Sequence, residues 1–195
     1  MPKQPPYPKS DRERKSLKEL MEQGEGLSGF AWPKTYTDFD MRILRDGTWT
    51  YRGGPIRRLK LCQLFATVLQ RDENGDYWLV TPVERGRIQV DDAPFVAVEM
   101  TEDKDADGRP VLRFRTNLDH WVSADADHPI RVAEDPETGE PSPYIHVRDG
   151  LEALIARPIF YDMVERAETV ETATGSTLVL DSAGQRFTLG HVDNG

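Results

Sequence analysis

Short runs of alternating or β-branched apolar residues follow one another along most of the chain. Turn signals such as DG, NG and DADG separate these runs. Alternation with period two is typical of half-buried strands, and Gly, Asn and Asp favour the tight turns between them. The pattern predicts strands at DMRIL, TWTYR, DYWLV, RGRIQV, PFVAVEM, VLRFRT, HWVSA, PIRVA and PYIHV.

Two longer segments, residues 55–72 and 150–167, carry apolar residues at three- and four-residue steps. This spacing predicts an amphipathic helix in each. Pro158 is expected to kink or split the second helix and to leave a new N-terminus at Ile159. An alternative for residues 65–80 is a β-hairpin around Asn74-Gly75, a dipeptide that favours tight turns between strands.

The two predicted helices match each other at a shift of 95 residues, with six apolar positions aligned. A strand precedes the turn in both copies. The pair DYWLV and RGRIQV follows the first helix, and STLVL and GQRFTL follow the second. Each copy therefore reads as strand, turn, helix and hairpin. This order predicts an α+β protein with a duplicated unit that forms two small domains.

The composition along the chain divides it into three parts. Residues 1–26 mix Pro, Lys and Glu with few large apolar groups, which predicts a flexible N-terminal tail. We expect an N-terminal α+β domain over residues 27–102 and a C-terminal α+β domain over residues 103–195.

Charge and cysteine content narrow the classes of protein. The net charge of −9 argues against a general nucleic-acid-binding surface. No apolar run approaches the roughly 20 residues of a membrane span, so no membrane partner is expected. The single cysteine excludes a disulfide framework, and the first residues lack the apolar stretch of a secretory signal. The expected location is the bacterial cytoplasm.

Basic residues gather in one stretch of this acidic chain. Residues 41–60 hold six basic side chains against Asp46 alone, and YRGGPIRRLKL places Arg57 and Arg58 at the start of the first predicted helix. Cations are unfavourable at a helix N-terminus because the helix dipole is positive there. A compact anion would relieve the repulsion and bind the free N–H groups. Solvation of the same charges by water is the alternative.

The second predicted helix lacks this conflict. Asp149 stands at its expected N-cap and Glu152 three residues later, an arrangement close to a capping box. The corresponding residues of the first copy are Gly54 and Arg57, which offer no side-chain acceptor. The contrast predicts a phosphate site at the first helix, where Arg52, Arg57 and Arg58 pair with phosphate and Gly53 and Gly54 allow close approach.

Further candidates could complete a site for a nucleotide. Trp49 or Tyr51 could offer an aromatic face to a base. The other candidates are Thr81 with Arg85, Asn117, and Arg157 with Tyr161, which lie four positions apart. Each has a structural alternative: a solvated turn for the first pair, a turn residue for Asn117, and an ordinary surface pair for the last two.

The sequence lacks the motifs of common enzymes. It has no G-x-S-x-G, P-loop, G-x-G-x-x-G or H-E-x-x-H pattern, and neither a metal site nor a cofactor is expected. Cys62 lies on the apolar stripe of the first predicted helix, which indicates a core position. A metal-dependent phosphoester hydrolase that uses Asp91, Asp92, Asp125 or Asp127 is a third, weaker hypothesis.

Several segments resemble a bacterial family of uncharacterised proteins, the domain-of-unknown-function family 1285. They are the run from DGTWTYRGGPIRRLKL to DDAPFVAV, then FRTN, VRDGLEALIARPIFYDMVE and the closing G-x-x-F-x-L-G. The resemblance covers roughly residues 27–190. It implies a two-domain α+β protein with a duplicated core and a C-terminal half similar to pleckstrin-homology folds. It also implies a nucleotide-like ligand between the domains and a role in signalling.

These observations predict a non-catalytic module that binds a small phosphate-bearing molecule in bacterial signal transduction, and the family resemblance implies that this molecule is nucleotide-like. The alternative is a protein-interaction adaptor, in which the arginines meet an acidic signalling partner and exposed strand edges accept a peptide.

Overall fold

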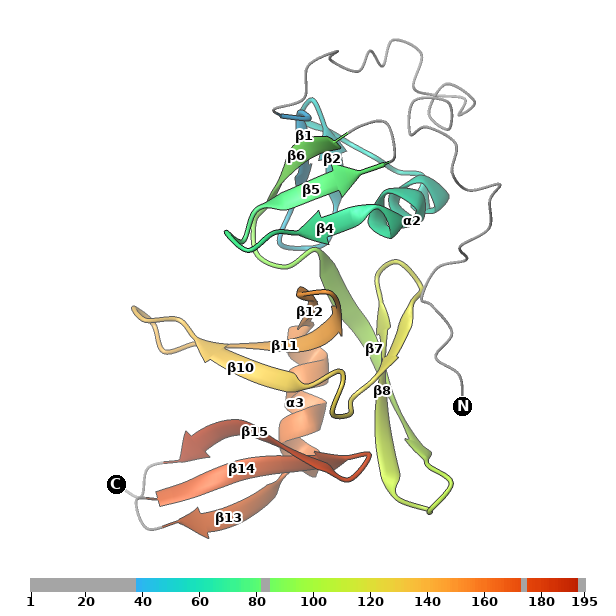
Figure 1. The fold of residues 1–195 in the computed structure, drawn as a ribbon. Coiled ribbons are helices and arrows are strands. Elements are labelled where there is room, and N and C mark those ends of the chain that lie inside the picture. The colour runs from blue at the N-terminus through green and yellow to red at the C-terminus, as the bar shows by residue number, and fades with distance from the viewer. Residues whose placement is uncertain (1–37, 82–84, 173–174, 193–195) are drawn as a thin grey trace. The chain divides into compact units, whose positions relative to one another are not determined.

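The computed structural model describes residues 38–81, 85–172 and 175–192 of the chain (Figure 1). The chain divides into two compact units between Asp91 and Asp92. The expected boundary at 102/103 falls inside strand β7 (Phe95–Lys104), whose antiparallel ladder with β8 runs on both sides of that point. The division therefore comes earlier in the chain. The predicted flexible tail, residues 1–26, lies outside the described residues.

The N-terminal unit is a six-stranded sheet with one helix. The strand order is β3-β2-β1-β6-β5-β4, and β1 and β6 pair in parallel whereas the other neighbours are antiparallel. The elements are β1 (Met41–Ile43), β2 (Trp49–Tyr51), β3 (Gly54–Pro55), α2 (Leu59–Thr67), β4 (Leu69–Arg71), β5 (Tyr77–Val80) and β6 (Arg85–Val90).

Helix α2 closes the core of this unit with its apolar face. Leu61, Cys62 and Phe65 are buried, and the ring of Phe65 stacks on Trp49 of β2 with 5.8 Å between the ring centroids. The predicted core position of Cys62 is confirmed, and burial raises the pKa of its thiol to about 11. This thiol is therefore protonated and unreactive at neutral pH.

The C-terminal unit holds a second six-stranded sheet and a separate three-stranded sheet. The larger sheet has the order β10-β11-β12-β7-β8-β9, with β12 and β7 in parallel, and the smaller has the order β13-β14-β15. After β7 come β8 (Pro110–Thr116), β9 (Trp121–Ser123), β10 (Ile130–Glu134), β11 (Pro141–Arg148), β12 (Leu151–Ile155), α3 (Arg157–Arg166), β13 (Glu168–Thr172), β14 (Gly175–Ser182) and β15 (Gln185–Val192).

The nine predicted strands all appear, but both predicted helices are shorter than expected. The first begins at Leu59, because Gly54 and Pro55 pair with β2, and it ends at Thr67. A hairpin of β4 and β5 around Asn74-Gly75 follows, so the alternative for residues 65–80 is right from Leu69 onward. In the second segment, residues 151–155 form β12, and the helix begins at Arg157 with Pro158 in its first turn.

The order of elements repeats along the chain, as the sequence predicts. Three strands, a helix and three more strands occur first as β1–β3, α2 and β4–β6, and again as β10–β12, α3 and β13–β15. The sheets differ between the copies. In the first, β1 and β6 join all strands into one sheet. In the second, β12 pairs with β7, and the last three strands form a sheet of their own.

The fold is thus α+β in the broad sense, with β-strands predominating (Figure 1). Within the described ranges, neither helix has the length and apolar character that crossing a bilayer requires.

Candidate functional site

The six basic residues of the stretch 41–60 all lie in the N-terminal unit. Arg42 on β1 forms an ion pair with Asp91 at 2.5 Å, and the Arg52 guanidinium lies over the Tyr51 ring at 5.1 Å. Arg57 and Lys60 are exposed, and neither makes a hydrogen bond or ion pair with another described residue. Of the six, these two are the ones for which the described part of the unit shows neither a polar partner nor an aromatic ring.

The start of α2 differs from the prediction. Its N-cap is Arg58, so Arg57 precedes the helix, and Pro55 belongs to β3 instead of the first helical turn. No side chain caps α2, and its first turn has no acidic residue. The same holds for α3, whose N-cap is Ala156. The expected contrast between a capped and an uncapped helix is therefore wrong.

The residues expected to cap the second helix form a tight turn between β11 and β12. Asp149 and Gly150 have φ values of 46° and 75°, which match the 49° and 75° of Arg52 and Gly53 between β2 and β3. Both dipeptides fit a type I′ turn, which needs positive φ at both central residues. Asp149 thus corresponds to Arg52 and not to Gly54. Glu152 lies on β12 and binds Arg131 through both carboxylate oxygens, at 2.7 and 2.6 Å.

The two aromatic candidates have different environments. Trp49 is 1% exposed and stacks on Phe65, so it belongs to the core and cannot offer a face to a base. Tyr51 is half-buried beneath Arg52 at the end of β2. Of the two rings, Tyr51 is the one that a ligand could reach.

The predicted pair Thr81 and Arg85 flanks residues 82–84, which lie outside the described residues. Thr81 is half-buried just after β5, and Arg85 begins β6 with its guanidinium 4.1 Å from the centroid of the Trp78 ring. The indole N–H of Trp78 donates to Asp72 at 2.8 Å. Arg85 therefore takes part in a local cluster on β5 and β6, and a cation–π contact of this kind still leaves its N–H donors available.

Asn117, Arg157 and Tyr161 lie in the C-terminal unit, apart in sequence from the other nine candidates. The side-chain oxygen of Asn117 accepts a bond from the Val96 N–H at 3.0 Å, while the Asn117 N–H donates to the Val96 carbonyl at 2.7 Å. This side chain thus extends the pairing beside β7. Arg157 binds Glu140 at 3.1 Å, and Tyr161 is 57% exposed one turn later on α3.

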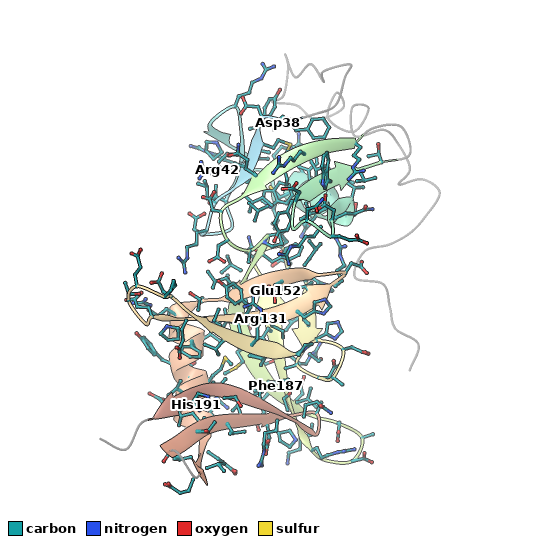
Figure 2. All side chains as sticks on the ribbon, turned by 60° about the vertical axis from the view of Figure 1, so that its left-hand side comes forward. Asp38, Arg42, Arg131, Glu152, Phe187 and His191 are labelled. Carbon is teal, nitrogen blue, oxygen red and sulfur yellow. The ribbon has the colours of Figure 1, made fainter. Side chains whose placement is uncertain are left out.

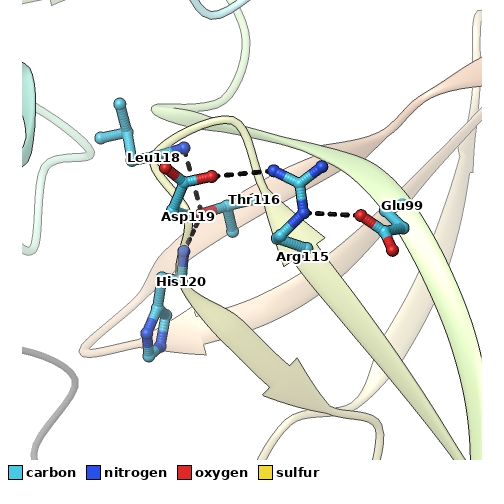
Figure 3. Close-up of polar contacts among 6 residues, drawn as sticks. All are labelled: Glu99, Arg115, Thr116, Leu118, Asp119 and His120. Atoms are coloured by element: carbon cyan, nitrogen blue, oxygen red, sulfur yellow. Dashed lines mark hydrogen bonds and ion pairs between the residues drawn. The ribbon is translucent and has the colours of Figure 1, made fainter. Parts of the chain in front are cut away.

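The turn around Asn117 is held by further polar contacts, shown in Figure 3. Arg115 bridges Glu99 at 2.6 Å and Asp119 at 2.8 Å, and these carboxylates raise the pKa of its guanidinium. The Thr116 hydroxyl accepts bonds from the N–H groups of Leu118 and His120. The FRTN segment therefore stabilises the β8–β9 turn, which favours the structural alternative for Asn117.

The N-terminal unit has a hollow of about 460 Å³ that the sequence does not reveal. Of the predicted site residues it contains Gly53 only, and Figure 2 labels Asp38 and Arg42 at it. It is bordered by β1, the turn after β2, and β6. Its lining is mixed in charge and consists of Asp38, Phe39, Asp40, Met41, Arg42, Thr50, Gly53 and Gln89.

A second hollow, of about 560 Å³, lies between β10 and β15 of the C-terminal unit. Figure 2 labels Arg131, Phe187 and His191 around it. Arg131 and Arg186 are both engaged in ion pairs, with Glu152 and Asp181. The strands β10 and β15 correspond to β1 and β6 of the first copy, which pair directly. No sequence signal marks this hollow, because it depends on two strands that are far apart in the chain.

The acidic residues of the hydrolase hypothesis are occupied by local contacts. Asp91 pairs with Arg42, and Asp92 accepts a bond from the Tyr144 hydroxyl at 2.7 Å. Asp125 accepts three bonds from the loop before β10, one of them from the ring of His128. Among the residues that the structure describes, no three His, Cys, Asp or Glu side chains are grouped as a metal site.

Two protein-family models match the chain in succession. The first is described as the "Domain of unknown function (DUF1285), N-terminal domain" and matches residues 31–93. The second is described as the "Protein of unknown function (DUF1285), C-terminal domain" and matches residues 94–189. The chain belongs to the DUF1285 family. The border between the two DUF1285 models agrees closely with the division of the structure after Asp91.

Two solved structures of DUF1285 proteins are similar to this chain. A family member from Silicibacter pomeroyi DSS-3 is 43% identical, with 91% of this chain and 96% of that chain covered and a TM-score of 0.74. A member from Shewanella baltica OS155 is 26% identical, with 65% of this chain and 91% of that chain covered and a TM-score of 0.52. A search of curated proteins finds no match.

Proposed function

We propose that this DUF1285 protein is a non-catalytic module that binds a small, phosphate-bearing molecule of the nucleotide type. The observation that carries the proposal is the exposure of Arg57 and Lys60, without a carboxylate partner among the described residues, in a chain of net charge −9. Most other arginines among the described residues are held by carboxylates or lie over aromatic rings.

Arg52 adds a third cation near the same stretch, in a turn that requires Gly53. Gly53 has a φ of 75°, and no atom lies within 4 Å of the place where its Cβ would stand. The backbone is therefore open to solvent at this turn, and a phosphate oxygen could approach its N–H groups. Tyr51, which lies under Arg52, supplies an aromatic ring for a base or sugar.

The experiment is a binding titration of the full chain with ATP, GTP, a cyclic dinucleotide and inorganic phosphate, followed by calorimetry and thermal shift. A ligand that binds the folded state raises the melting temperature. The double variant Arg57→Gln/Lys60→Gln is expected to bind at least about tenfold more weakly, because each charge-assisted bond to phosphate contributes on the order of 1.5–3 kcal/mol.

The matched control is Arg166→Gln, which removes an exposed arginine of the C-terminal unit that pairs with Glu102. It lowers the net charge by one and should leave the affinity within about twofold, since exposed ion pairs contribute little. The proposal fails if no phosphate compound shifts the melting temperature at millimolar concentration. It fails equally if the double variant binds as the wild type does.

A second candidate function is a protein-interaction adaptor in signal transduction. The edges of β10 and β15 favour it, because each is the last strand of its sheet and no backbone hydrogen bond between described residues joins the two. An unpaired strand edge can pair with an extended peptide. As part of this candidate function, we propose that the C-terminal half resembles pleckstrin-homology folds. Its antiparallel strands and single helix support this likeness.

Pull-down with the full chain and the variant Val132→Pro tests the adaptor. Proline in β10 removes one edge N–H and disfavours pairing with a further strand. A stoichiometric partner retained by the double variant at Arg57 and Lys60 but lost with Val132→Pro would support the adaptor. A partner that is indifferent to Val132→Pro would contradict it.

A further inference from the structure

The side chain of His146 connects two loops of the C-terminal unit. Its Nδ1 lies 3.0 Å from the backbone carbonyl oxygen of Asp127, in the loop that precedes β10. Its Nε2 accepts a hydrogen bond from the Gly150 N–H at 3.2 Å, in the β11–β12 turn. Both ring nitrogens are thus engaged with backbone groups whose roles are fixed.

These partners determine the protonation state of the ring. A backbone carbonyl can only accept, so Nδ1 must carry the hydrogen. A backbone N–H can only donate, so Nε2 must keep its lone pair. The arrangement therefore requires the neutral imidazole in its Nδ1–H form. An imidazolium has a hydrogen on both nitrogens and would direct its Nε2–H at the Gly150 N–H.

The bond to His146 supports a turn whose backbone conformation is unfavourable. Asp149 and Gly150 both have positive φ, and a non-glycine residue adopts this conformation at a conformational penalty. Strand β11 is joined to the loop before β10 by a second bond, from the His146 N–H to the Pro129 carbonyl at 3.0 Å. This backbone bond does not depend on the charge of the ring. Protonation would thus affect the turn more than the strand.

The surroundings contain charged and titratable groups from every neighbouring segment. The His128 ring lies 6.1 Å from that of His146, and its Nδ1 is 3.0 Å from Asp125. The Nδ1–H of a neutral or of a charged imidazole can donate to this carboxylate. Two imidazolium rings at this distance would then repel each other. The remaining groups are Asp127 on the loop, Glu152 opposite His146 on β12, where Arg131 binds it, Arg148 and Asp149 at the turn, and His120 on the β8–β9 turn.

His120 belongs to the same electrostatic group. Burial lowers the pKa of His120, and the Arg148 charge and His128 lower it further. Since the folded state keeps His120 neutral more strongly than the unfolded chain does, protonation of His120 itself destabilises the fold as the pH falls.

We propose that His146 is a pH-dependent latch: its neutral ring ties the β11–β12 turn to the loop before β10, and protonation of the ring releases the turn. The latch belongs to the C-terminal unit and is independent of the phosphate site proposed in the N-terminal unit. Acidification should open residues 148–150 while the strands around them stay folded.

The test is solution NMR on the full chain. Long-range proton–nitrogen spectra at about pH 7.5 should give the Nδ1–H form for His146, and spectra recorded on acidification to about pH 5 should show the imidazolium. The Gly150 amide should lose at least about tenfold in exchange protection, corrected for intrinsic rates, in the same pH interval. The Leu112 amide reports the intact fold, since it binds the buried Ser182 hydroxyl.

Two variants separate the latch from a general effect of acid. In His146→Phe the Gly150 amide should exchange rapidly at both pH values. In His191→Phe, which removes an exposed histidine on β15, the pH dependence of Gly150 should remain as in the wild type. An Nε2–H form of His146 at neutral pH overturns the proposal. The proposal is also overturned if the exchange protection of the Gly150 amide does not change together with the protonation of His146. Both measurements need only the wild-type protein.

Discussion

Gly86 on β6 shows how one residue type is imposed by packing. A Cβ at this position would overlap the ring of Phe39, which is 2% exposed and lies directly against the strand. Gly86→Ala should therefore destabilise the protein by about 1–3 kcal/mol, the usual effect of overpacking a core. Urea denaturation measures this loss. Gly190→Ala on β15 is the control, because no atom lies within 4 Å of its Cβ position. Equal effects of both substitutions would contradict the packing argument.

Asp72 stabilises the β4–β5 turn through its charge. Its carboxylate accepts the Trp78 indole N–H at 2.8 Å and the N–H groups of Asn74 and Asp76, and the Trp78 bond is the largest cause of the lowered pKa of Asp72. A carboxyl group whose pKa is lowered by folding stabilises the fold above its unfolded pKa, and this contribution is lost as the pH falls through the folded value.

The stability difference between wild type and Asp72→Asn should accordingly be constant above about pH 5 and shrink as the pH falls below about 4. Urea denaturation at several pH values measures it. Glu73→Gln removes a neighbouring exposed charge, and its free energy of unfolding should differ little from that of the wild type at each pH. If the two variants give parallel profiles, the Asp72 contacts do not stabilise the turn.

At the scale of elements, local pattern predicts most strands, and long-range pairing decides the rest. The alternation in RGRIQV gives β6 with its bounds, because Gly86 and Ile88 face the core while Arg87 and Gln89 face out. LEALI is ambiguous: its apolar residues fit helical steps, yet Leu151, Ala153 and Ile155 are buried with period two. The parallel pairing of β12 with β7, whose paired residues lie 58 positions earlier in the chain, makes this segment a strand.

The candidate site could be predicted from the sequence only in part, because it too depends on long-range pairing between strands. The basic stretch and the Gly53 turn are local features, and their exposure follows from residue type. The helix-cap contrast depended on where two helices begin, and both starts move by several residues when Gly54, Pro55 and residues 151–155 join sheets. The burial of Trp49 likewise depends on α2 folding over β2, which a local pattern does not contain.

Ser182 connects the three-stranded sheet to the larger sheet of the C-terminal unit. Its hydroxyl is fully buried, accepts the Leu112 N–H at 2.9 Å and donates to the Ala124 carbonyl at 2.7 Å. Ser182→Ala leaves both backbone groups without this partner and should destabilise the protein by about 1–3 kcal/mol in urea denaturation. Ser176→Ala, which removes a single bond to Glu171, should have a smaller effect. The opposite ranking would show that the Ser182 bonds contribute little.

At the scale of the molecule, each unit has its own set of buried apolar side chains. Trp49, Phe65 and Leu79 are fully buried in the first, and Phe114, Ile145 and Met163 in the second. Domains with separate cores can open separately, and amide exchange under native conditions resolves such openings. A substitution in one core should then alter exchange mainly in the unit that contains it.

The Gly86→Ala variant tests this expectation. Its overpacked Phe39 contact should raise amide exchange rates by about tenfold or more in β1, β5 and β6, since about 1.4 kcal/mol of lost stability corresponds to a tenfold change in an opening equilibrium. Exchange in β8, β11 and β14 should stay within about twofold of the wild type. Ser182→Ala should give the reverse pattern. Exchange should be faster in β8 and β14, and it should not be accelerated in β1 or β6. If either substitution accelerates exchange equally in both units, the two cores unfold as one cooperative structure, because an opening that exposes one core would then expose the other.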